Sequence, residues 1–394
     1  MKICYLCPDL GISVDGQKGA SSHIRGFVNA LKQQGCELFI VTPCPVKEGT
    51  IDVPIIVIPK PQFIEGLANA ADNRTFRALR HIFYNSAIES QLKEIIPKEK
   101  PDFIYERYSP FSAAGGIFAR QNNIPHILEV NAPLAEQGKR YRKQALQQAS
   151  ELLEQEAFKQ TNLLITLTRE LKTWLIENGA PPEKVKVRPS GVDEKMFAIE
   201  GASYKERFAN KIVLGFVGSL KQWHDIELLA TIFRRLASDP KYHLLVVGDG
   251  PMLNTIQNLS KELPGRVTIT GAIEQEEVPK YIRSMDIALA PYPDMDVFYF
   301  SPLKVYEYMA MGKAVIATSI GQLNTLIQHN VNGCLVPVQD VNAWIHEIQT
   351  LAACDPLRKR LGETAAKNIH ENHTWTKRAQ QFISIVEDTF YASC

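Results

Sequence analysis

Several features that define common protein classes are missing from this sequence of 394 residues. No run of about 20 apolar residues occurs, so we expect no membrane-spanning helix. The first residues lead directly into a strand pattern, so we expect no signal peptide. A net charge of +1 provides no basic field for nucleic acid. The seven cysteines are an odd number scattered along the chain, which favours a reducing compartment over a disulfide framework.

Metal and nucleotide signatures are also scarce. Cys4 and Cys7 form a C-x-x-C pair inside the first strand pattern, with no second pair at metal spacing, so we interpret them as small buried residues. The chain has no G-x-G-x-x-G with a ribose-binding acid, which disfavours a nicotinamide enzyme. It has no G-x-x-x-x-G-K-[S/T], which argues against a P-loop NTPase. We expect no resident cofactor and no metal.

The sequence instead alternates between short apolar runs and helical patterns, which predicts doubly wound α/β domains. At this length two domains are expected. We predict an N-terminal domain over 1–193, a second domain over 194–373 and a C-terminal helix over 374–394 that could pack on either domain. Helical patterns also fill 61–97. The predicted strands are 2–7, 38–42, 55–58, 103–105, 126–130, 163–166, 185–188, 212–217, 243–247, 267–270, 286–292, 313–318 and 333–337.

Glycine-containing loops stand at predicted strand-to-helix junctions. One contains Gly19, one runs from Gly215 to His224, and one is Gly248-Asp249-Gly250-Pro251. A single glycine at a strand end is usually only a turn. Several such loops indicate phosphate-binding backbone gathered at the carboxyl edges of two sheets.

The stretch Ser301–Gly312 joins two of these predicted strands and has the features of a helix. Ser301 is predicted as N-cap, Pro302 as first helical residue and Gly312 as the left-handed residue after the last turn. The helix N-terminus would face the carboxyl edge of the sheet, where N–H groups favour an anion. Lys304 has the wrong sign for that end of the helix unless a phosphate binds there.

Glu307 lies on an otherwise apolar face of the same helix. A carboxylate is costly to bury unless something hydrogen-bonds to it. Glu307 either reaches solvent at the helix edge or accepts two hydroxyls of a sugar ring.

Together these segments resemble the family 4 glycosyltransferases, retaining enzymes of the GT-B fold. The resemblance rests on 286–318, on Pro189-Ser190-Gly191-Val192-Asp193 and on the glycine loops. It implies two Rossmann-like domains facing across a cleft. It also implies that Glu307 binds the donor ribose, and that Gly19 and the N–H groups near Pro302, Leu303 and Lys304 meet the donor phosphates. Residues assigned to the donor are Gly19, Ser219, His224, Gly250, Ala272, Ile273, Tyr299, Ser301, Pro302 and Leu303.

Two positions depart from the family pattern. Tyr299 stands where the family often has a first glutamate that contacts the donor sugar, so Asp294 or Asp296 could replace it. The family usually has an arginine and a lysine after the Val-Gly pair, where this chain has Ser219 and His224 with Lys221 between them. His224 is a candidate for phosphate binding or a residue that caps its loop.

The acceptor side carries fewer signals. We assign His23, Glu129 and Asn131 to it; the alternative for Glu129 and Asn131 is ordinary loop capping. The basic run Lys139–Lys143 is either a solvated helix face or a contact for an anionic acceptor or a membrane surface.

The predicted function is transfer of a sugar from a UDP- or GDP-linked donor to an acceptor hydroxyl, in carbohydrate biosynthesis, with retention and without metal. Glu307, Lys304 and Lys221 are the predicted catalytic residues. The acceptor is a small molecule, a saccharide or a lipid-linked molecule; nucleic acid is not expected. A cytoplasmic location is expected, with peripheral membrane contact left open, and the oligomeric state is not predicted. A nucleotide-sugar epimerase and a non-catalytic sugar-nucleotide binding protein are the alternatives.

Overall fold

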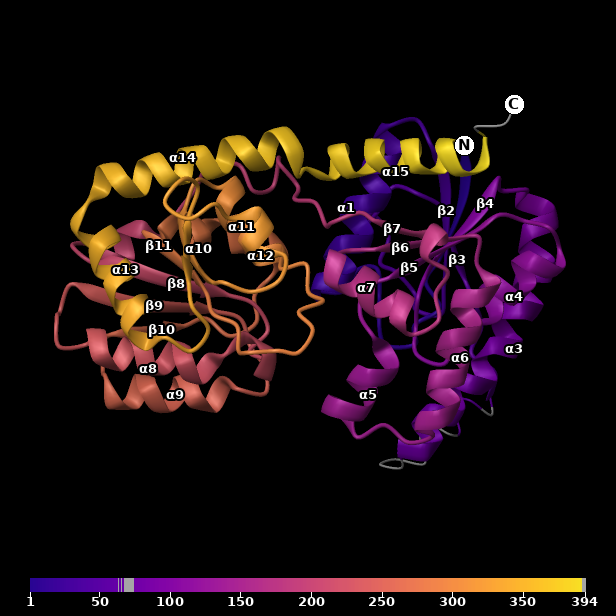
Figure 1. Cartoon of the computed structure of the whole chain (residues 1–394), viewed down its shortest axis with the longest axis horizontal. Coiled ribbons are helices and arrows are strands. Elements are labelled where there is room, and N and C mark those ends of the chain that lie inside the picture. Colours follow the sequence, from indigo (N-terminus) through magenta and orange to yellow (C-terminus); the bar gives the residue numbers. More distant parts are fainter. Residues whose placement is uncertain (63, 65, 67–73, 392–394) are drawn as a thin grey trace. The chain divides into compact units, whose positions relative to one another are not determined.

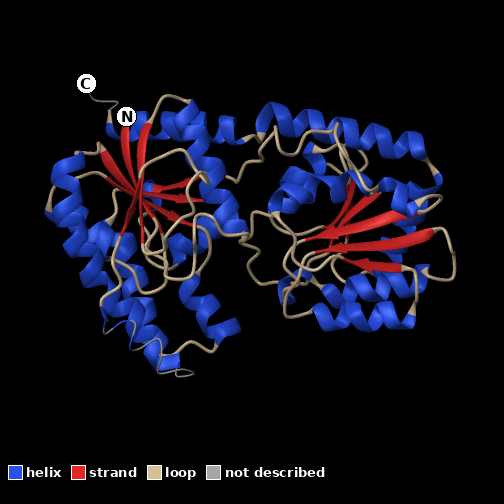
Figure 2. Cartoon of the chain, turned by 180° about the vertical axis from the view of Figure 1, so that it is seen from behind, coloured by secondary structure: helices blue, strands red, loops and turns tan. Residues whose placement is uncertain are grey.

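The structure, a computed structural model, describes residues 1–391 except 63, 65 and 67–73. Its contacts divide the chain into two compact units. Unit 1 comprises Met1–Ser190, Tyr299–Ser301 and Thr376–Cys394, and unit 2 comprises Gly191–Phe298 and Pro302–Trp375. In each unit helices cover both faces of a parallel sheet (Figures 1 and 2).

Unit 1 contains a seven-stranded parallel sheet with the order β3-β2-β1-β4-β5-β6-β7. The strands are β1 (Lys2–Leu6), β2 (Glu37–Thr42), β3 (Ile55–Val57), β4 (Phe103–Arg107), β5 (His126–Val130), β6 (Leu163–Thr166) and β7 (Val185–Val187). The helices are α1 (Gly19–Gln33), α3 (Arg74–Glu99), α4 (Ala114–Gln121), α5 (Leu134–Arg142), α6 (Gln147–Gln160), α7 (Arg169–Glu177) and most of α15 (Trp375–Phe390), with the 3-10 turn η1 (Pro182–Lys184).

Unit 2 contains a six-stranded parallel sheet with the order β10-β9-β8-β11-β12-β13. The strands are β8 (Ile212–Val217), β9 (Tyr242–Val247), β10 (Val267–Ile269), β11 (Ile287–Ala290), β12 (Ala314–Thr318) and β13 (Cys334–Val336). The helices are α8 (Ile226–Leu236), α9 (Leu253–Glu262), α10 (Val278–Ser284), α11 (Leu303–Ala310), α12 (Leu323–Leu326), α13 (Val341–Ala353) and α14 (Asp355–Asn372), with the 3-10 turns η2 (Lys205–Phe208), η3 (Gln222–His224) and η4 (Gln275–Glu277).

Every strand predicted from the sequence is present, with ends that differ by at most two residues. The apolar runs form strands because both faces of each parallel sheet are covered and therefore dry. Part of the predicted helical stretch 61–97 lies outside the described residues, and residues 74–97 lie in α3. Cys4 and Cys7 are fully buried free thiols, and burial raises the pKa of both.

The prediction that Ser301 caps α11 is wrong. The helix begins at Leu303, and Pro302 occupies the cap position with φ −77° and ψ 89°, without a side-chain cap. A residue before proline is driven out of the helical region, so Ser301 lies outside the helix. The backbone N–H of Ser190 donates to its hydroxyl at 3.3 Å. Gly312 follows the helix with φ +66°, as predicted.

Contacts from β8 and α14 hold the C-terminal half of helix α11. The N–H of Val217, at the end of β8, donates to the Tyr308 hydroxyl at 2.6 Å. Helix α14 passes so close that a Cβ at Gly362 would lie 1.9 Å from the Gly312 carbonyl oxygen. His370 of α14 contacts the Ala310 carbonyl at 3.1 Å. These contacts fix the helix relative to the sheet of unit 2.

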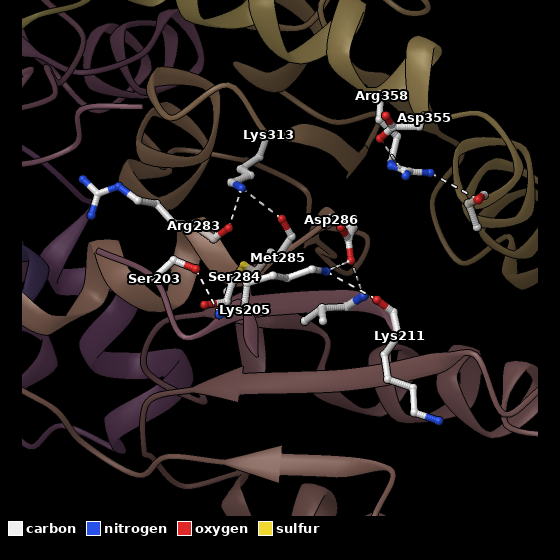
Figure 3. A network of polar contacts seen from close by, with 12 residues as sticks. Ser203, Lys205, Lys211, Arg283, Ser284, Met285, Asp286, Lys313, Asp355 and Arg358 are labelled. Carbon is white, nitrogen blue, oxygen red and sulfur yellow. Dashed lines mark hydrogen bonds and ion pairs between the residues drawn. The ribbon is translucent and has the colours of Figure 1, made fainter. Parts of the chain in front are cut away.

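The amino edge of the same sheet is closed by polar contacts (Figure 3). The Lys313 ammonium donates to the carbonyls of Arg283 and Met285 at 2.8 and 3.0 Å. Asp286 accepts from the Val213 N–H at 2.7 Å and pairs with Lys205. Each charge at this edge therefore has a partner within unit 2.

Segment 198–204 is fastened to the same edge. The Arg283 guanidinium donates to the carbonyls of Ala198 and Ala202 at 2.9 and 3.1 Å, and the Tyr204 N–H donates to the Ser284 hydroxyl at 2.8 Å. The polar stretch 194–210 thus contributes to unit 2.

Candidate functional site

Glycine loops meet at the carboxyl edge of the unit 2 sheet. Gly218 follows β8, and Gly248 and Gly250 follow β9; all three have positive φ, at 142°, 130° and 156°. A Cβ at Gly248 would lie 2.2 Å from the Gly218 carbonyl oxygen. A Cβ at Gly250 would lie 2.7 Å from the Leu220 nitrogen. Only glycine permits this backbone contact between the two loops.

Backbone hydrogen bonds join these loops to the one after β10. The N–H of Leu220 donates to Asp249, and the N–H of Met252 donates back to Leu220, both at 2.9 Å. The N–H of Gly248 donates to Gly271 at 3.1 Å. Ala272 and Ile273 come directly after Gly271, so three predicted donor-binding loops are gathered at one edge.

Lys304 of α11 extends beneath the β8 loop. Its side chain is buried, and its Nζ lies 3.9 Å from the centre of the Phe216 ring and 5.8 Å from that of Tyr292. A Cβ at Gly218 would approach this Nζ to 3.0 Å. In the part of the chain that the structure describes, the Nζ has no hydrogen-bond partner. Burial lowers the pKa of Lys304 to about 7, although Glu307 acts to raise it.

His224 lies beside this lysine. Its Nδ1 contacts the Ser219 carbonyl, and its ring packs edge-on against Phe216 and Tyr292. Burial and the neighbouring Lys304 lower its pKa to about 2, so the ring is neutral at pH 7. The carbonyl contact requires the proton on Nδ1, which leaves Nε2 as an acceptor. His224 therefore adds no positive charge here, and Lys304 is the cation that lies beside Gly218.

Glu307 is half-buried one turn beyond Lys304. Burial raises the pKa of its carboxyl to about 7, and Lys304 opposes that shift. Among the described residues no hydrogen bond or ion pair to this carboxylate is found. Lys221 is half-buried in the loop before η3, and Ser219 is exposed there. The site thus places a cation, a carboxyl group and exposed loop backbone around the first turns of α11.

In unit 1 the predicted acceptor residues also come together. Glu129 is fully buried at the end of β5. One carboxylate oxygen lies 3.0 Å from His23 Nε2 and 2.9 Å from Arg107, and it also accepts from the Asn131 amide. The other accepts from Arg188 at 2.9 Å. His23, Glu129 and Asn131 therefore form one cluster, with Glu129 at its centre.

The groups around Glu129 keep its carboxylate ionised. Burial acts to raise the pKa of Glu129, but His23, Arg188 and Arg107 outweigh it and hold the pKa well below its usual range. Burial lowers the pKa of His23. With every carboxylate lone pair engaged, Glu129 is suited to orienting its neighbours.

Three residues predicted to bind the donor lie in unit 1. Gly19 opens α1, where it is exposed. The Tyr299 hydroxyl accepts from the Gln137 amide of α5 at 2.9 Å, and Tyr299 is buried. Ser301 is bound by Ser190, as described above. The predicted donor residues are therefore divided between the two units, with Pro302, Leu303, Ser219, His224, Gly250, Ala272 and Ile273 in unit 2.

Sequence reasoning missed several residues of these two clusters. Arg107 is the last residue of β4 and Arg188 follows β7, and charged residues at the carboxyl ends of strands were the available signal. The Tyr105 hydroxyl also donates to Glu129. Phe216 and Tyr292, which surround Lys304, read as strand residues in the sequence and gave no separate signal.

Neither metal-ligand clusters nor membrane-length apolar helices occur within the described residues. No group of three or more His, Cys, Asp or Glu side chains there could hold a metal ion. No helix there is both long and apolar enough to cross a bilayer.

Two family models match successive parts of the chain. Residues 17–195 match Glycosyltransferase Family 4, and residues 211–354 match Glycosyl transferases group 1. An uncharacterized glycosyltransferase of Methanocaldococcus jannaschii is 27% identical over 236 residues, which are 58% of this chain and 59% of the relative. The chain thus spans about three fifths of that relative.

A second relative and a solved structure extend the likeness. The UDP-Gal:alpha-D-GlcNAc-diphosphoundecaprenol alpha-1,3-galactosyltransferase of Escherichia coli is 26% identical over 271 residues, 65% of this chain and 68% of the relative. The crystal structure of Anabaena HepE in complex with UDP and glucose has a TM-score of 0.73 and 17% identity, and covers 98% of this chain and 100% of that one. That likeness shows the fold, which is GT-B. The chain belongs to the family 4 glycosyltransferases.

Proposed function

We propose that this protein transfers a sugar from a UDP- or GDP-linked donor to an acceptor hydroxyl, with retention of the anomeric configuration and without a metal ion. The observation that carries the proposal is Lys304. It is a buried ammonium group with no hydrogen-bond partner among the described residues, beside the glycine loops and in the first turn of α11. A buried charge is stable only when it is paired, so an anionic ligand is expected there.

A diphosphate fits this position. The first N–H groups of a helix have no partner within the helix, and here they lie in the same turn as the Lys304 ammonium. Glu307, one turn further on, can accept the two ribose hydroxyls. The UDP and glucose named for the HepE structure, and the UDP-linked donor named for the Escherichia coli relative, support a nucleoside diphosphate sugar.

In the proposed reaction, catalysis depends on stabilising the diphosphate that leaves. The bond between the anomeric carbon and the β-phosphate oxygen breaks, and the acceptor oxygen bonds to that carbon on the same face. The acceptor proton passes to a β-phosphate oxygen. Lys304, Lys221 and the N–H groups of α11 stabilise the negative charge on the departing diphosphate.

The two units have separate tasks in this proposal. Unit 2 binds the donor, while the cluster of His23, Glu129 and Asn131 in unit 1 orients a small-molecule, saccharide or lipid-linked acceptor. The name of the Escherichia coli relative supports a diphosphate-linked lipid among these classes. The basic residues Lys139, Arg140, Arg142 and Lys143 are exposed on and just after α5, as a contact with an anionic membrane surface would require.

Incubation with a panel of UDP- and GDP-sugars tests the proposal. Nucleotides are first screened by thermal shift, because a ligand at about 100 times its dissociation constant adds about 2.7 kcal/mol of stability. The best donor is then incubated with acceptors of the three classes. Transfer of the sugar supports the proposal; epimer formation, or binding without chemistry, would overturn it.

Metal independence has its own test. Transfer measured in EDTA should equal transfer in magnesium or manganese. The nearest carboxylate pair to α11, Asp294 and Asp296, is exposed in the loop after β11. If EDTA abolished transfer and a divalent ion restored it, these two residues would become ligand candidates and the lysine-based account of the leaving group would fail.

A further inference from the structure

Lys304 and Glu307 are opposite charges three residues apart on α11, and yet they do not pair. Residues at this spacing are neighbours on a helix surface and commonly form ion pairs. The structure contains such pairs, for example Lys280 with Glu277. No ion pair joins Lys304 to Glu307 in the described part of the chain. The Lys304 ammonium is instead buried without a hydrogen-bond partner there, and Glu307 is half-buried.

The groups around the Lys304 ammonium stabilise its charge only in part. From β8 and its loop come Gly218 and the Phe216 ring, whose face makes a cation–π contact with the ammonium. Close by lies His224, which is neutral and on which Lys221 also acts. The loop after β11 contributes Tyr292, and burial raises the pKa of its hydroxyl. Tyr308 of α11 is likewise held neutral by burial. Among the described residues, Glu307 is the carboxyl group that acts on Lys304.

We propose that donor binding changes the charge of these two residues: the diphosphate favours protonation of Lys304, and the ribose hydroxyls favour loss of the proton from Glu307. This inference rests on the proposed function, because it assigns the diphosphate and the ribose to the same two side chains. The diphosphate supplies the anion that the buried ammonium lacks. The ribose hydroxyls donate to a carboxylate and therefore favour its ionised form.

Proton uptake by Lys304 and proton release by Glu307 have opposite signs and occur in different pH ranges. Both groups have a pKa of about 7 in the structure. At pH 8 Lys304 is largely uncharged and Glu307 is ionised, so a nucleoside diphosphate takes up a proton. At pH 6 Lys304 is charged and Glu307 is protonated, so the same ligand releases a proton. Net proton exchange on binding should therefore change sign near pH 7.

Isothermal titration calorimetry with UDP and GDP, in pairs of buffers with different ionisation enthalpies, measures this exchange. At pH 8 the native protein should take up close to one proton more than Lys304→Met. At pH 6 it should release close to one proton more than Glu307→Gln. Subtracting the proton exchange measured with a variant from that of the native protein removes the protons that the ligand itself gains or loses. Inorganic pyrophosphate should reproduce the uptake at pH 8 and should be insensitive to Glu307→Gln.

Lys313 provides a matched control. It is also a largely buried lysine of unit 2, and burial lowers its pKa to about 8, but it lies at the amino edge and donates to two carbonyls (Figure 3). Lys313→Met should leave the proton exchange unchanged. Nucleotide binding with the same exchange in the native protein and both site variants would overturn the inference and leave the proposed function standing. Failure of every nucleotide and nucleotide sugar to bind would overturn the proposed function itself.

Discussion

Each unit has charged side chains at the carboxyl edge of its sheet. The charges are paired with one another in unit 1, but they are not paired in the described part of unit 2. In unit 1, Glu129 is surrounded by Arg107, Arg188 and His23, and its pKa is held low. In unit 2, Lys304 and Glu307 have no hydrogen-bond or ion-pair partner in the described residues, and burial moves the pKa of both toward 7. Paired charges position groups, whereas charges without an ion-pair partner mark the place where a ligand can supply one.

The contrast also predicts that acid has opposite effects on the contributions of Glu129 and Glu307 to stability. Glu129 has a lowered pKa, so its contribution to stability is present above about pH 4.5 and is lost as the pH falls below that value. Glu307 has a raised pKa, so the folded chain binds more protons than the unfolded chain between pH 4.5 and 7. Acidification through that window therefore increases the contribution of Glu307 to stability, while His224 of the same unit, whose pKa is lowered to about 2, acts in the opposite direction. The free energy of unfolding of the native protein, compared across this pH range with that of Glu129→Gln and of Glu307→Gln, isolates the contribution of each carboxyl group.

The largest effect is expected from Glu129→Ala. Removing this carboxylate leaves two arginines buried beside each other, and breaking a buried pair costs roughly 3–5 kcal/mol. The free energy of unfolding, from urea titration, should fall by that amount. Glu129→Gln keeps the shape and part of the hydrogen bonding, so its loss should be smaller. The exposed Glu48 of the same unit is the control, and Glu48→Ala should change stability by less than about 0.5 kcal/mol. Equal losses for Glu48→Ala and Glu129→Ala would contradict the assignment of a network in unit 1.

Glu307→Gln should weaken donor binding and leave the fold intact. A hydrogen bond to a charged group contributes about 1.5–3 kcal/mol, which corresponds to a roughly 10- to 150-fold rise in the dissociation constant. Glutamine has the same size and needs no charge, so stability at pH 7 should not fall. The dissociation constant of the nucleotide is measured by calorimetry. An unchanged constant would remove the ribose from this residue.

Lys304→Met should stabilise the ligand-free protein, because methionine fills the same space without a buried charge. Replacing a buried ionic group by an apolar one can add about 1 kcal/mol or more. The lowered pKa means that stability in the native protein rises between pH 7 and 10.5, while Glu307 makes it fall between 4.5 and 7. The gain in stability of Lys304→Met over the native protein should therefore shrink as the pH rises from 7 to 10.5. A variant less stable than the native protein at every pH would show that Lys304 is paired in solution.

The strands and the glycine loops could be predicted because local sequence determines them. Buried parallel strands are apolar runs, and a left-handed turn such as Gly312 requires glycine. The environment of Lys304 could not be predicted, since Phe216 and Tyr292 come from distant segments and look like ordinary strand residues. Arg188 was likewise missed, because only the fold brings β7 and β5 close enough to place it against Glu129. The start of α11 was misplaced by one residue because Pro302 suits the first turn of a helix and its cap position equally well.

The smallest effect concerns Tyr299, which stands where the family often has a glutamate. A phenol makes one neutral hydrogen bond and carries no charge at neutral pH, so it cannot hold two sugar hydroxyls as a carboxylate does. In the structure, the Tyr299 hydroxyl already accepts a hydrogen bond from the Gln137 amide at 2.9 Å within unit 1. We therefore expect other groups, chiefly Asp294 or Asp296 and the N–H groups of Phe300 and Ser301, to hold the donor sugar. Tyr299→Phe loses one neutral hydrogen bond and should cost less than about tenfold in donor specificity.

The exposed Asp294 and Asp296 of the same loop provide the comparison for Tyr299. Asp294→Asn or Asp296→Asn should cost more than Tyr299→Phe, because a carboxylate that accepts from sugar hydroxyls loses a charge-assisted bond. All three variants are assayed for kcat/KM with the same donor and with one epimeric donor. Gln137→Leu removes the partner of Tyr299 and should reproduce the small effect of Tyr299→Phe. A phenylalanine variant that loses transfer entirely, beside two nearly normal asparagine variants, would instead make the tyrosine hydroxyl the main contact of the sugar.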